Sequence, residues 1–202
     1  MPGQGATLDF SSMSKHGEKL RNLLEEQALL PGPIVLSNGQ KSDFYFDCKK
    51  VTLSSRGADL VADAFLAVLD ALQEKPQAIG GLTHGADPII GAVQMRALER
   101  DVHYDAFYVR KEPKKHGTKQ WIENPPASGT KVVIVDDVVT TGKSVVMAIE
   151  KARESGCNVL AVIALVDREQ GGADVIRKAC PNYHCVYTAK DFPKIKALAQ
   201  AN

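Results

Sequence analysis

One segment constrains the fold of this chain more than any other. It spans residues 132–144 and reads Val-Val-Ile-Val-Asp-Asp-Val-Val-Thr-Thr-Gly-Lys-Ser. Its apolar start, without polar alternation, predicts a strand that is buried on both faces. Asp136 and Asp137 end that strand, and a turn and a helix follow. Strands of this kind occur in parallel sheets with helices on each side, so the segment predicts an α/β fold.

The rest of the chain alternates in the same way, which favours a mostly parallel twisted sheet flanked by helices. The predicted strands are Ile34–Ser37, Phe44–Asp47, Ala78–Leu82, Tyr104–Arg110, Lys131–Asp136, Asn158–Val166 and Tyr183–Thr188. The predicted helices are Lys15–Leu30, Arg56–Glu74, Asp87–Arg100, Gly142–Ser155, Gly172–Ala179 and Asp191–Ala201. Pro31-Gly32-Pro33 is expected to end the first helix.

Two segments stand outside the alternation. Asn38-Gly39 between two apolar runs predicts a hairpin, so residues 1–50 are expected to form a small hood over one end of the sheet. Residues 111–128 are polar, basic and rich in Gly and Pro, which predicts a long mobile loop. We expect a single domain over residues 1–202, with its ligand site at the carboxyl ends of the strands.

Composition excludes several classes of function. A net charge of +1 gives no reason to expect nucleic acid or a membrane as partner. The N-terminus lacks the pattern of a signal peptide, and four irregularly spaced cysteines favour a reducing cytoplasm. Cys180, His184 and Cys185 fall short of the four ligands of a structural zinc site.

The turn after the central strand has the chemistry of a phosphate site. Backbone N–H groups at a helix N-terminus lack partners and have partial positive charge. Thr140, Thr141 and Ser144 add hydroxyl donors, and Gly142 allows close approach of the backbone. Asp136 and Asp137 suit the hydroxyl groups of a ribose, or Mg²⁺ bound directly or through water. A ribose 5-phosphate satisfies both halves of the segment.

Three alternatives apply to the same segment. Gly142-Lys143-Ser144 resembles the end of a Walker A loop, but that pattern needs Gly where Asp137 stands. A dinucleotide fingerprint needs more than the one Gly of this turn. A plain strand, turn and helix with an acidic end also remains open.

A basic segment, Arg110-Lys111-Glu112-Pro113-Lys114-Lys115-His116-Gly117, follows a predicted strand. One interpretation is a solvated run of charges. The other is a basic lid that closes over phosphates, excludes water and supplies positive charge where a leaving group becomes more anionic.

The segment at residues 132–144 resembles the phosphoribosyl diphosphate (PRPP) motif of type I phosphoribosyltransferases. Enzymes for adenine, hypoxanthine and orotate share this motif, and so do some non-catalytic regulators. Three further segments are similar to orotate phosphoribosyltransferases in particular. They are the basic segment, the hood sequence at residues 36–47, and Asp167-Arg168-Glu169-Gln170-Gly171-Gly172. The four motifs occur in the family's order.

The resemblance implies site residues position by position. Lys114, Asp136 and Asp137 fall on catalytic positions, and Thr140, Arg168, Tyr45 and Phe46 on orotate-binding positions. An arginine suits orotate because its guanidinium matches a planar carboxylate. The implied PRPP contacts are Arg110, Lys111, Lys114, His116, Asp136, Asp137, Val138, Val139, Thr140, Thr141, Gly142, Lys143, Ser144, His84 and Gly85.

Two family lysines are missing from this chain. Ser37 stands at the hood position and Gly85 in the diphosphate loop. We expect backbone N–H groups of His84 and Gly85 to replace part of the second contact, and Lys41 part of the first.

The resemblance also implies an activity. That activity is Mg²⁺-dependent transfer of ribose 5-phosphate from PRPP to orotate in pyrimidine synthesis, by a homodimer whose catalytic loops reach the neighbouring subunit. A purine phosphoribosyltransferase and a PRPP-binding regulator are the alternatives.

Overall fold

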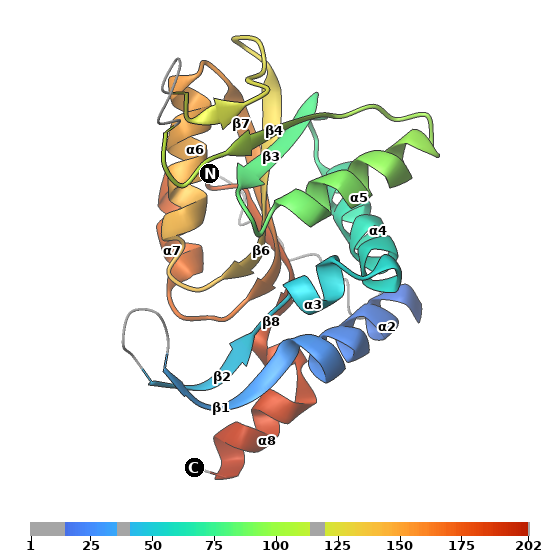
Figure 1. The fold of residues 1–202 in the computed structure, drawn as a ribbon, viewed down its shortest axis with the longest axis vertical. Helices are drawn as coiled ribbons and strands as arrows, with labels where there is room; N and C mark the ends of the chain where they lie inside the picture. Colours follow the sequence, from blue (N-terminus) through green and yellow to red (C-terminus); the bar gives the residue numbers. More distant parts are fainter. Residues whose placement is uncertain (1–14, 36–40, 114–119, 202) are drawn as a thin grey trace.

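The structure is a computed structural model that describes residues 15–35, 41–113 and 120–201. Its main sheet has six strands in the order β5-β4-β3-β6-β7-β8 (Figure 1). The strands are β3 (Ala78–Leu82), β4 (Asp105–Val109), β5 (Ile122–Glu123), β6 (Lys131–Val139), β7 (Asn158–Asp167) and β8 (Tyr183–Thr188). All neighbouring pairs are parallel except β4 with β5. The predicted α/β fold with a mostly parallel sheet is confirmed.

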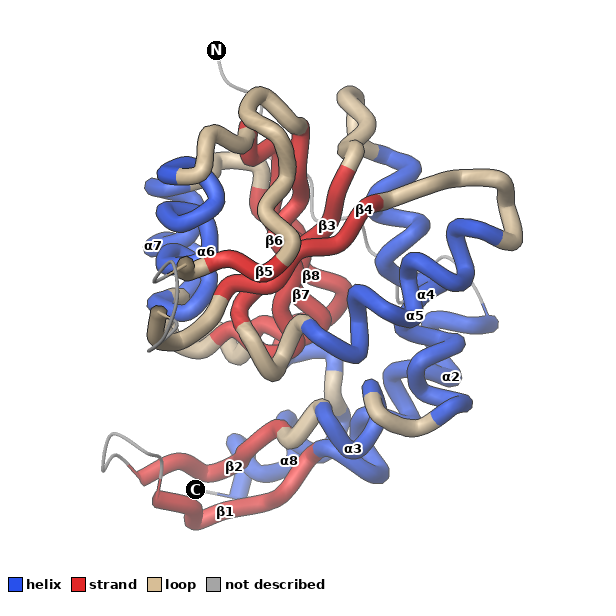
Figure 2. The backbone as a smooth tube through the Cα atoms, turned by 45° about the horizontal axis from the view of Figure 1, so that its top comes forward, coloured by secondary structure: helices blue, strands red, loops and turns tan. Residues whose placement is uncertain are grey.

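Helices cover both faces of this sheet. Figure 2 shows α4 (Ser55–Ala71) and α5 (Asp87–Leu98) on one side, and α6 (Lys143–Glu154) and α7 (Gly172–Ala179) on the other. Each side has its own hydrophobic core, and β6 contributes alternate residues to the two. Val133 and Val135 belong to the first core, and Val132 and Ile134 to the second. This explains why the strand has no polar residue before Asp136.

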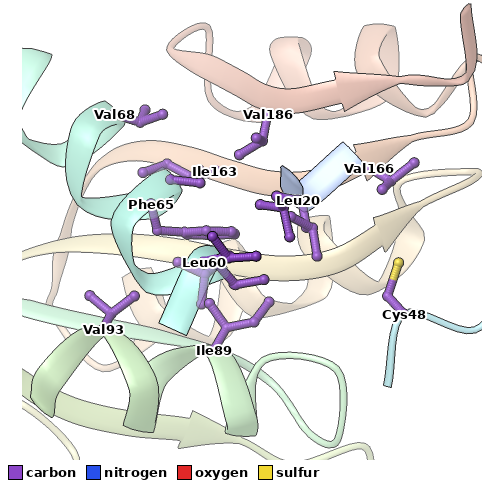
Figure 3. Packing of buried hydrophobic residues seen from close by; sticks show 14 of the residues in the cluster. Leu20, Cys48, Leu60, Phe65, Val68, Ile89, Val93, Ile163, Val166 and Val186 are labelled. Atoms are coloured by element: carbon purple, nitrogen blue, oxygen red, sulfur yellow. The ribbon is translucent and has the colours of Figure 1, made fainter. Parts of the chain in front are cut away.

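The first core also binds the N-terminal segment to the sheet. Figure 3 shows Leu20 close to Leu60, Phe65 and Ile163, among buried residues of α4, α5 and β7. Leu20 belongs to α2 (Lys15–Leu23), and it is fully buried. The hood is therefore held against the main domain by the same hydrophobic contacts that pack α4 on the sheet.

The predicted hairpin exists within the described residues as β1 (Leu29–Val35) and β2 (Lys41–Phe46), which pair antiparallel. It lies apart from the main sheet, next to α8 (Pro193–Ala201), as Figure 1 shows. Its turn at Asn38-Gly39 lies outside the described residues. Hydrogen bonds from Arg168, just after β7, place β2 near the carboxyl end of that strand. This is the end of the sheet at which we expected a ligand.

The prediction of one helix from Lys15 to Leu30 was wrong. The α-helix ends at Leu23, a π-helical turn η1 (Leu24–Ala28) follows, and Leu29 already begins β1. Pro31-Gly32-Pro33 lies inside the strand, where the register shifts between Pro31 and Ile34. Proline is tolerated at such irregularities because no ladder hydrogen bond needs its missing N–H. Pairing with β2 thus overrides the helical pattern.

Several other boundaries also differ from prediction. A short helix α3 (Lys49–Thr52) follows β2 and was not anticipated. The predicted loop contains β5, which extends the sheet beside β4. β6 continues to Val139, three residues beyond its predicted end, because its pairing with β7 continues to that point. The remaining boundaries agree with prediction to within a few residues. Among the described residues, no helix has the length and apolar character needed to span a membrane.

Candidate active site

Asp136 and Asp137 lie side by side near the end of β6, and both are buried. The N–H of Asp137 donates to Asp136 Oδ1 at 3.1 Å, and that of Val138 to Asp137 Oδ1 at 2.9 Å. Burial, and after it the neighbouring Asp137 carboxylate, raises the pKa of Asp136 to about 8. Burial also raises the pKa of Asp137, against the opposing charge of Lys49. The pair offers acceptor oxygens at the mouth of the site.

The turn after these acids leads directly into α6. Thr140 is half-buried, whereas Thr141 and Ser144 are exposed. Gly142 is the N-cap of α6, adopts a left-handed φ of 77° and provides no side-chain cap. The first N–H groups of a helix need partners from outside the helix. With hydroxyl groups beside it and no capping side chain, this helix end is suited to an anion.

The loop after β3 passes against the acid pair. A Cβ added at Gly85 would lie 2.5 Å from Asp137 Oδ1 and 2.8 Å from Asp136 Oδ1. His84 is exposed, with Nδ1 3.3 Å from Asp87 Oδ2. The N-terminus of α5 follows at Asp87. The structure therefore brings Gly85 to the acid pair, and a side chain at position 85 would require the Asp136 and Asp137 carboxyl groups to shift.

Arg168 is the buried cation of the site, with 4% of its surface exposed. Its Nη2 donates to Ser42 Oγ at 2.8 Å and to the carbonyl oxygen of Phe44 at 2.7 Å. The guanidinium carbon lies 4.8 Å from the centre of the Phe44 ring. Its backbone N–H donates to the Val139 carbonyl at 3.0 Å, which fixes the arginine beside the acidic turn. The Nε of Arg168 is buried without a hydrogen-bond partner. Burial also lowers the pKa of this arginine.

Asp167 holds the turn that presents this arginine. Its Oδ2 accepts from Tyr183 Oη and its Oδ1 from the N–H of Glu169, both at 2.8 Å. Asp167 is itself buried, so its charge needs these donors. The pair of bonds fixes the end of β7 and the start of the turn, and thereby the position of Arg168.

The comparisons with known proteins agree with this geometry. Residues 50–191 match the model of the phosphoribosyl transferase domain family. An orotate phosphoribosyltransferase from Synechocystis sp. is 39% identical over 191 residues, which are 94% of this chain and 95% of that protein. The crystal structure of orotate phosphoribosyltransferase from Aeropyrum pernix is 31% identical with a TM-score of 0.74, covering 91% of this chain and 99% of that one.

A third relative was crystallised with a ligand. It is the orotate phosphoribosyltransferase of Mycobacterium tuberculosis H37Rv in complex with 5-phospho-alpha-D-ribosyl 1-diphosphate. It is 26% identical with a TM-score of 0.71, and the match covers 91% of this chain and 99% of that one.

This chain belongs to the orotate phosphoribosyltransferase family. It is accordingly a pentosyltransferase enzyme. The family resemblance that the four sequence motifs indicated is confirmed.

In this orotate phosphoribosyltransferase, the two hood aromatics have different surroundings. Phe46 is 2% exposed, and its ring centre lies 4.8 Å from that of Phe192 in the first core. Tyr45 is 36% exposed. Successive side chains of a strand point to opposite faces, so Phe44 is on the other face of β2 from Tyr45. Phe44 lies against Arg168. The structure thus assigns Phe46 to the core, and Phe44 takes the place beside the arginine.

The basic segment is only partly described. Arg110 Nη1 donates to Glu123 Oε1 at 2.8 Å, so this guanidinium binds β5 across from β4. Lys111 is exposed, and its charge acts to lower the pKa of Asp136, although burial outweighs it. Lys114, His116 and Gly117 lie outside the described residues, as does Ser37. Their predicted roles stay predictions.

Sequence reasoning gave no role to three residues of this site: Lys49, and Ser42 and Asp167, which lie within two of the motifs. The Nζ of Lys49 lies 3.7 Å from Asp137 Oδ2. Ser42 bonds Arg168 across 126 positions of sequence, which no local pattern reveals. The available signal for Lys49 was a pair of lysines that begins two residues after the predicted hood strand.

Replacing Gly142 tests the turn. The Gly142→Ala substitution would place a Cβ 2.8 Å from the Gly172 carbonyl oxygen and hold alanine at φ 77°. We expect a loss of roughly 1–3 kcal/mol in the free energy of unfolding, measured by urea titration. Gly91→Ala is the matched control, because nothing lies within 4 Å of its Cβ position in α5. It should be neutral or up to about 1 kcal/mol stabilising. Equal losses in both variants would contradict this account.

The raised pKa of Asp136 predicts a pH dependence of stability without ligand. Between the unfolded value of about 4 and the folded value of about 8, the folded state holds a proton that the unfolded chain has lost. Ionisation of Asp136 therefore lowers the stability of the wild type as pH rises through this window. Asp136→Asn removes this loss, so its advantage over wild type should grow from about pH 5 to about pH 9 in urea titrations. Asp105→Asn controls for removal of an exposed carboxylate. A difference in stability between Asp136→Asn and wild type that does not change with pH would contradict the raised pKa of Asp136.

Proposed function

We propose that this enzyme transfers the 5-phosphoribosyl group of PRPP to N1 of orotate, giving orotidine 5′-monophosphate and diphosphate in pyrimidine nucleotide synthesis. The observation that most supports it is Arg168. This buried guanidinium keeps Nε unpartnered beside the acidic turn, and its backbone N–H is bonded to Val139. A buried donor without a hydrogen-bond partner lowers the stability of the protein unless a ligand accepts its hydrogen bond. The carboxylate that distinguishes orotate from uracil is a suitable acceptor.

Different residues of the site bind different parts of PRPP. Asp136 and Asp137 accept hydroxyl hydrogens of the ribose, and the turn at residues 140–144 binds its 5-phosphate. His84, Gly85 and the basic segment, with Lys114 foremost, are placed at the diphosphate. The bond from C1 to the diphosphate oxygen breaks, the bond from N1 to C1 forms, and diphosphate leaves with the electron pair. The N1 proton is released to solvent. The protein contributes position and charge, and no side chain attacks.

Mg²⁺ fits this site as a partner of the substrate. Among the described residues, no three His, Cys, Asp or Glu side chains are grouped so that they could hold a metal. We therefore infer that diphosphate oxygens bind Mg²⁺, with Asp136 or Asp137 reaching it through water. Bound there, Mg²⁺ would offset the charge of the departing diphosphate.

The proposal extends to assembly and location. A homodimer in which Lys114 and His116 reach the neighbouring site follows the family pattern stated above. A cytoplasmic location is supported by the cysteines, because Cys48, Cys157, Cys180 and Cys185 are all free.

A substrate panel tests the proposal. Purified protein would be incubated with PRPP and Mg²⁺, and the absorbance of orotate, adenine or hypoxanthine followed. We expect turnover of orotate alone, and its loss when a chelator removes Mg²⁺. Turnover of a purine would indicate the purine enzyme, and PRPP binding without turnover of any base would indicate a regulator.

Arg168 is expected to determine orotate affinity. The Arg168→Ala substitution removes a charge-assisted contact, so KM for orotate should rise roughly 10- to 100-fold. KM for PRPP should change little. Arg168→Lys keeps the charge but not the paired geometry, so its KM for orotate should lie between those of wild type and Arg168→Ala. Arg56→Ala, at an exposed position, is the control. Because Arg168 also holds β2, each variant needs a melting curve, and a variant that is folded yet loses only PRPP affinity would overturn the assignment.

A further inference from the structure

Lys49 is a cation that no sequence motif assigns to the site. It begins α3 immediately after β2, and its Nζ lies 3.7 Å from Asp137 Oδ2 and 3.9 Å from Asp47 Oδ1. Its side chain is 46% exposed. The ammonium group is thus within reach of the acid pair and also open to a ligand that arrives from solvent. Within the described part of the chain, it is the one cation within 4 Å of either acid.

Gly85 has no side chain, so a positive charge beside the acid pair has to come from another residue. The resemblance places a lysine of the diphosphate loop at this position. A Cβ at position 85 would lie 2.5 Å from Asp137 Oδ1, so a side chain there would require the acid side chains to shift. Gly85 faces Oδ1 of Asp137, and Lys49 faces Oδ2 of the same carboxylate. The ammonium group therefore reaches the same carboxylate that the diphosphate loop passes.

Charge balance supports a substrate contact. The buried Asp137 carboxylate repels an anion such as diphosphate unless positive charge lies between it and the ligand. Arg110 is engaged with Glu123, and Arg168 with β2. Partial burial acts to lower the pKa of Lys49, but the Asp137 and Asp47 carboxylates outweigh it and raise that pKa. The lysine therefore stays charged when substrate arrives.

We propose that Lys49 binds the diphosphate group of PRPP and replaces the lysine that position 85 lacks. The inference rests on the proposed function. In the resting protein Lys49 offsets the charge of Asp137. When PRPP binds, its ammonium group contacts diphosphate oxygens while Asp137 turns to the ribose. It remains protonated throughout, and it stabilises the diphosphate as the bond to C1 breaks. Lys49 is thus a substrate-binding residue supplied by the hood.

The test compares three ligands that share parts of PRPP. Lys49→Gln and wild type would be titrated by calorimetry with PRPP, inorganic diphosphate and ribose 5-phosphate, each with Mg²⁺. Loss of one charge-assisted contact should weaken PRPP and diphosphate binding roughly 10- to 100-fold. Ribose 5-phosphate lacks the diphosphate and should bind within about twofold of wild type. Lys49→Arg should restore most of the lost affinity, because it keeps the charge.

Lys50→Gln is the matched control, one residue along the same helix and also exposed. It should bind all three ligands as wild type does. If Lys49→Gln keeps full diphosphate affinity, or loses ribose 5-phosphate affinity equally, the inference is wrong. The second outcome would mean that Lys49 only supports the acid pair.

Steady-state kinetics separates this inference from the proposed function. Lys49→Gln should raise KM for PRPP and lower kcat, with KM for orotate within about twofold of wild type. Absence of orotate turnover in wild type would refute the proposed function, and the diphosphate titrations would still decide the role of Lys49.

Discussion

Two carboxylates held out of water at the end of β6 are the constraint around which this site is built. Burial of charge is unfavourable unless neighbours offset it. Backbone N–H groups of the turn donate to Asp136 and Asp137, and Lys49 approaches Asp137 from α3. Gly85 lets the loop after β3 pass directly beside both acids. Segments far apart in the sequence therefore meet at one point.

Arg168 is the second buried charge, and it joins the hood to the sheet. Its backbone is bonded to the turn after β6, and its guanidinium to Ser42 and Phe44 of β2. The proposed orotate site thus lies between the end of a core strand and a hairpin from outside the sheet. The two hydrophobic cores hold the sheet rigidly, so the polar groups at its edge have fixed positions without substrate.

The sequence predicted best where structure depends on neighbours along the chain. The alternation of strands and helices, and the passage from β6 through Gly142 into α6, agree with the structure. Prediction failed where pairing with a distant strand decides the outcome. Leu29 and Leu30 were predicted to end a helix, yet they pair with β2. The hood aromatics show the same limit, because sequence does not tell which face of an isolated hairpin meets the core.

The sequence by itself determined the strand, turn and helix at residues 132–144, because the acids, hydroxyls and glycine of this segment are contiguous. It also determined the family, through four motifs in order. Only the tertiary structure decided which cations meet these acids. Lys49 reaches Asp137, and Arg168 reaches Ser42, through contacts between elements far apart in the chain. Such contacts depend on how the hood packs on the sheet, and packing of this kind leaves no periodic signal in the sequence.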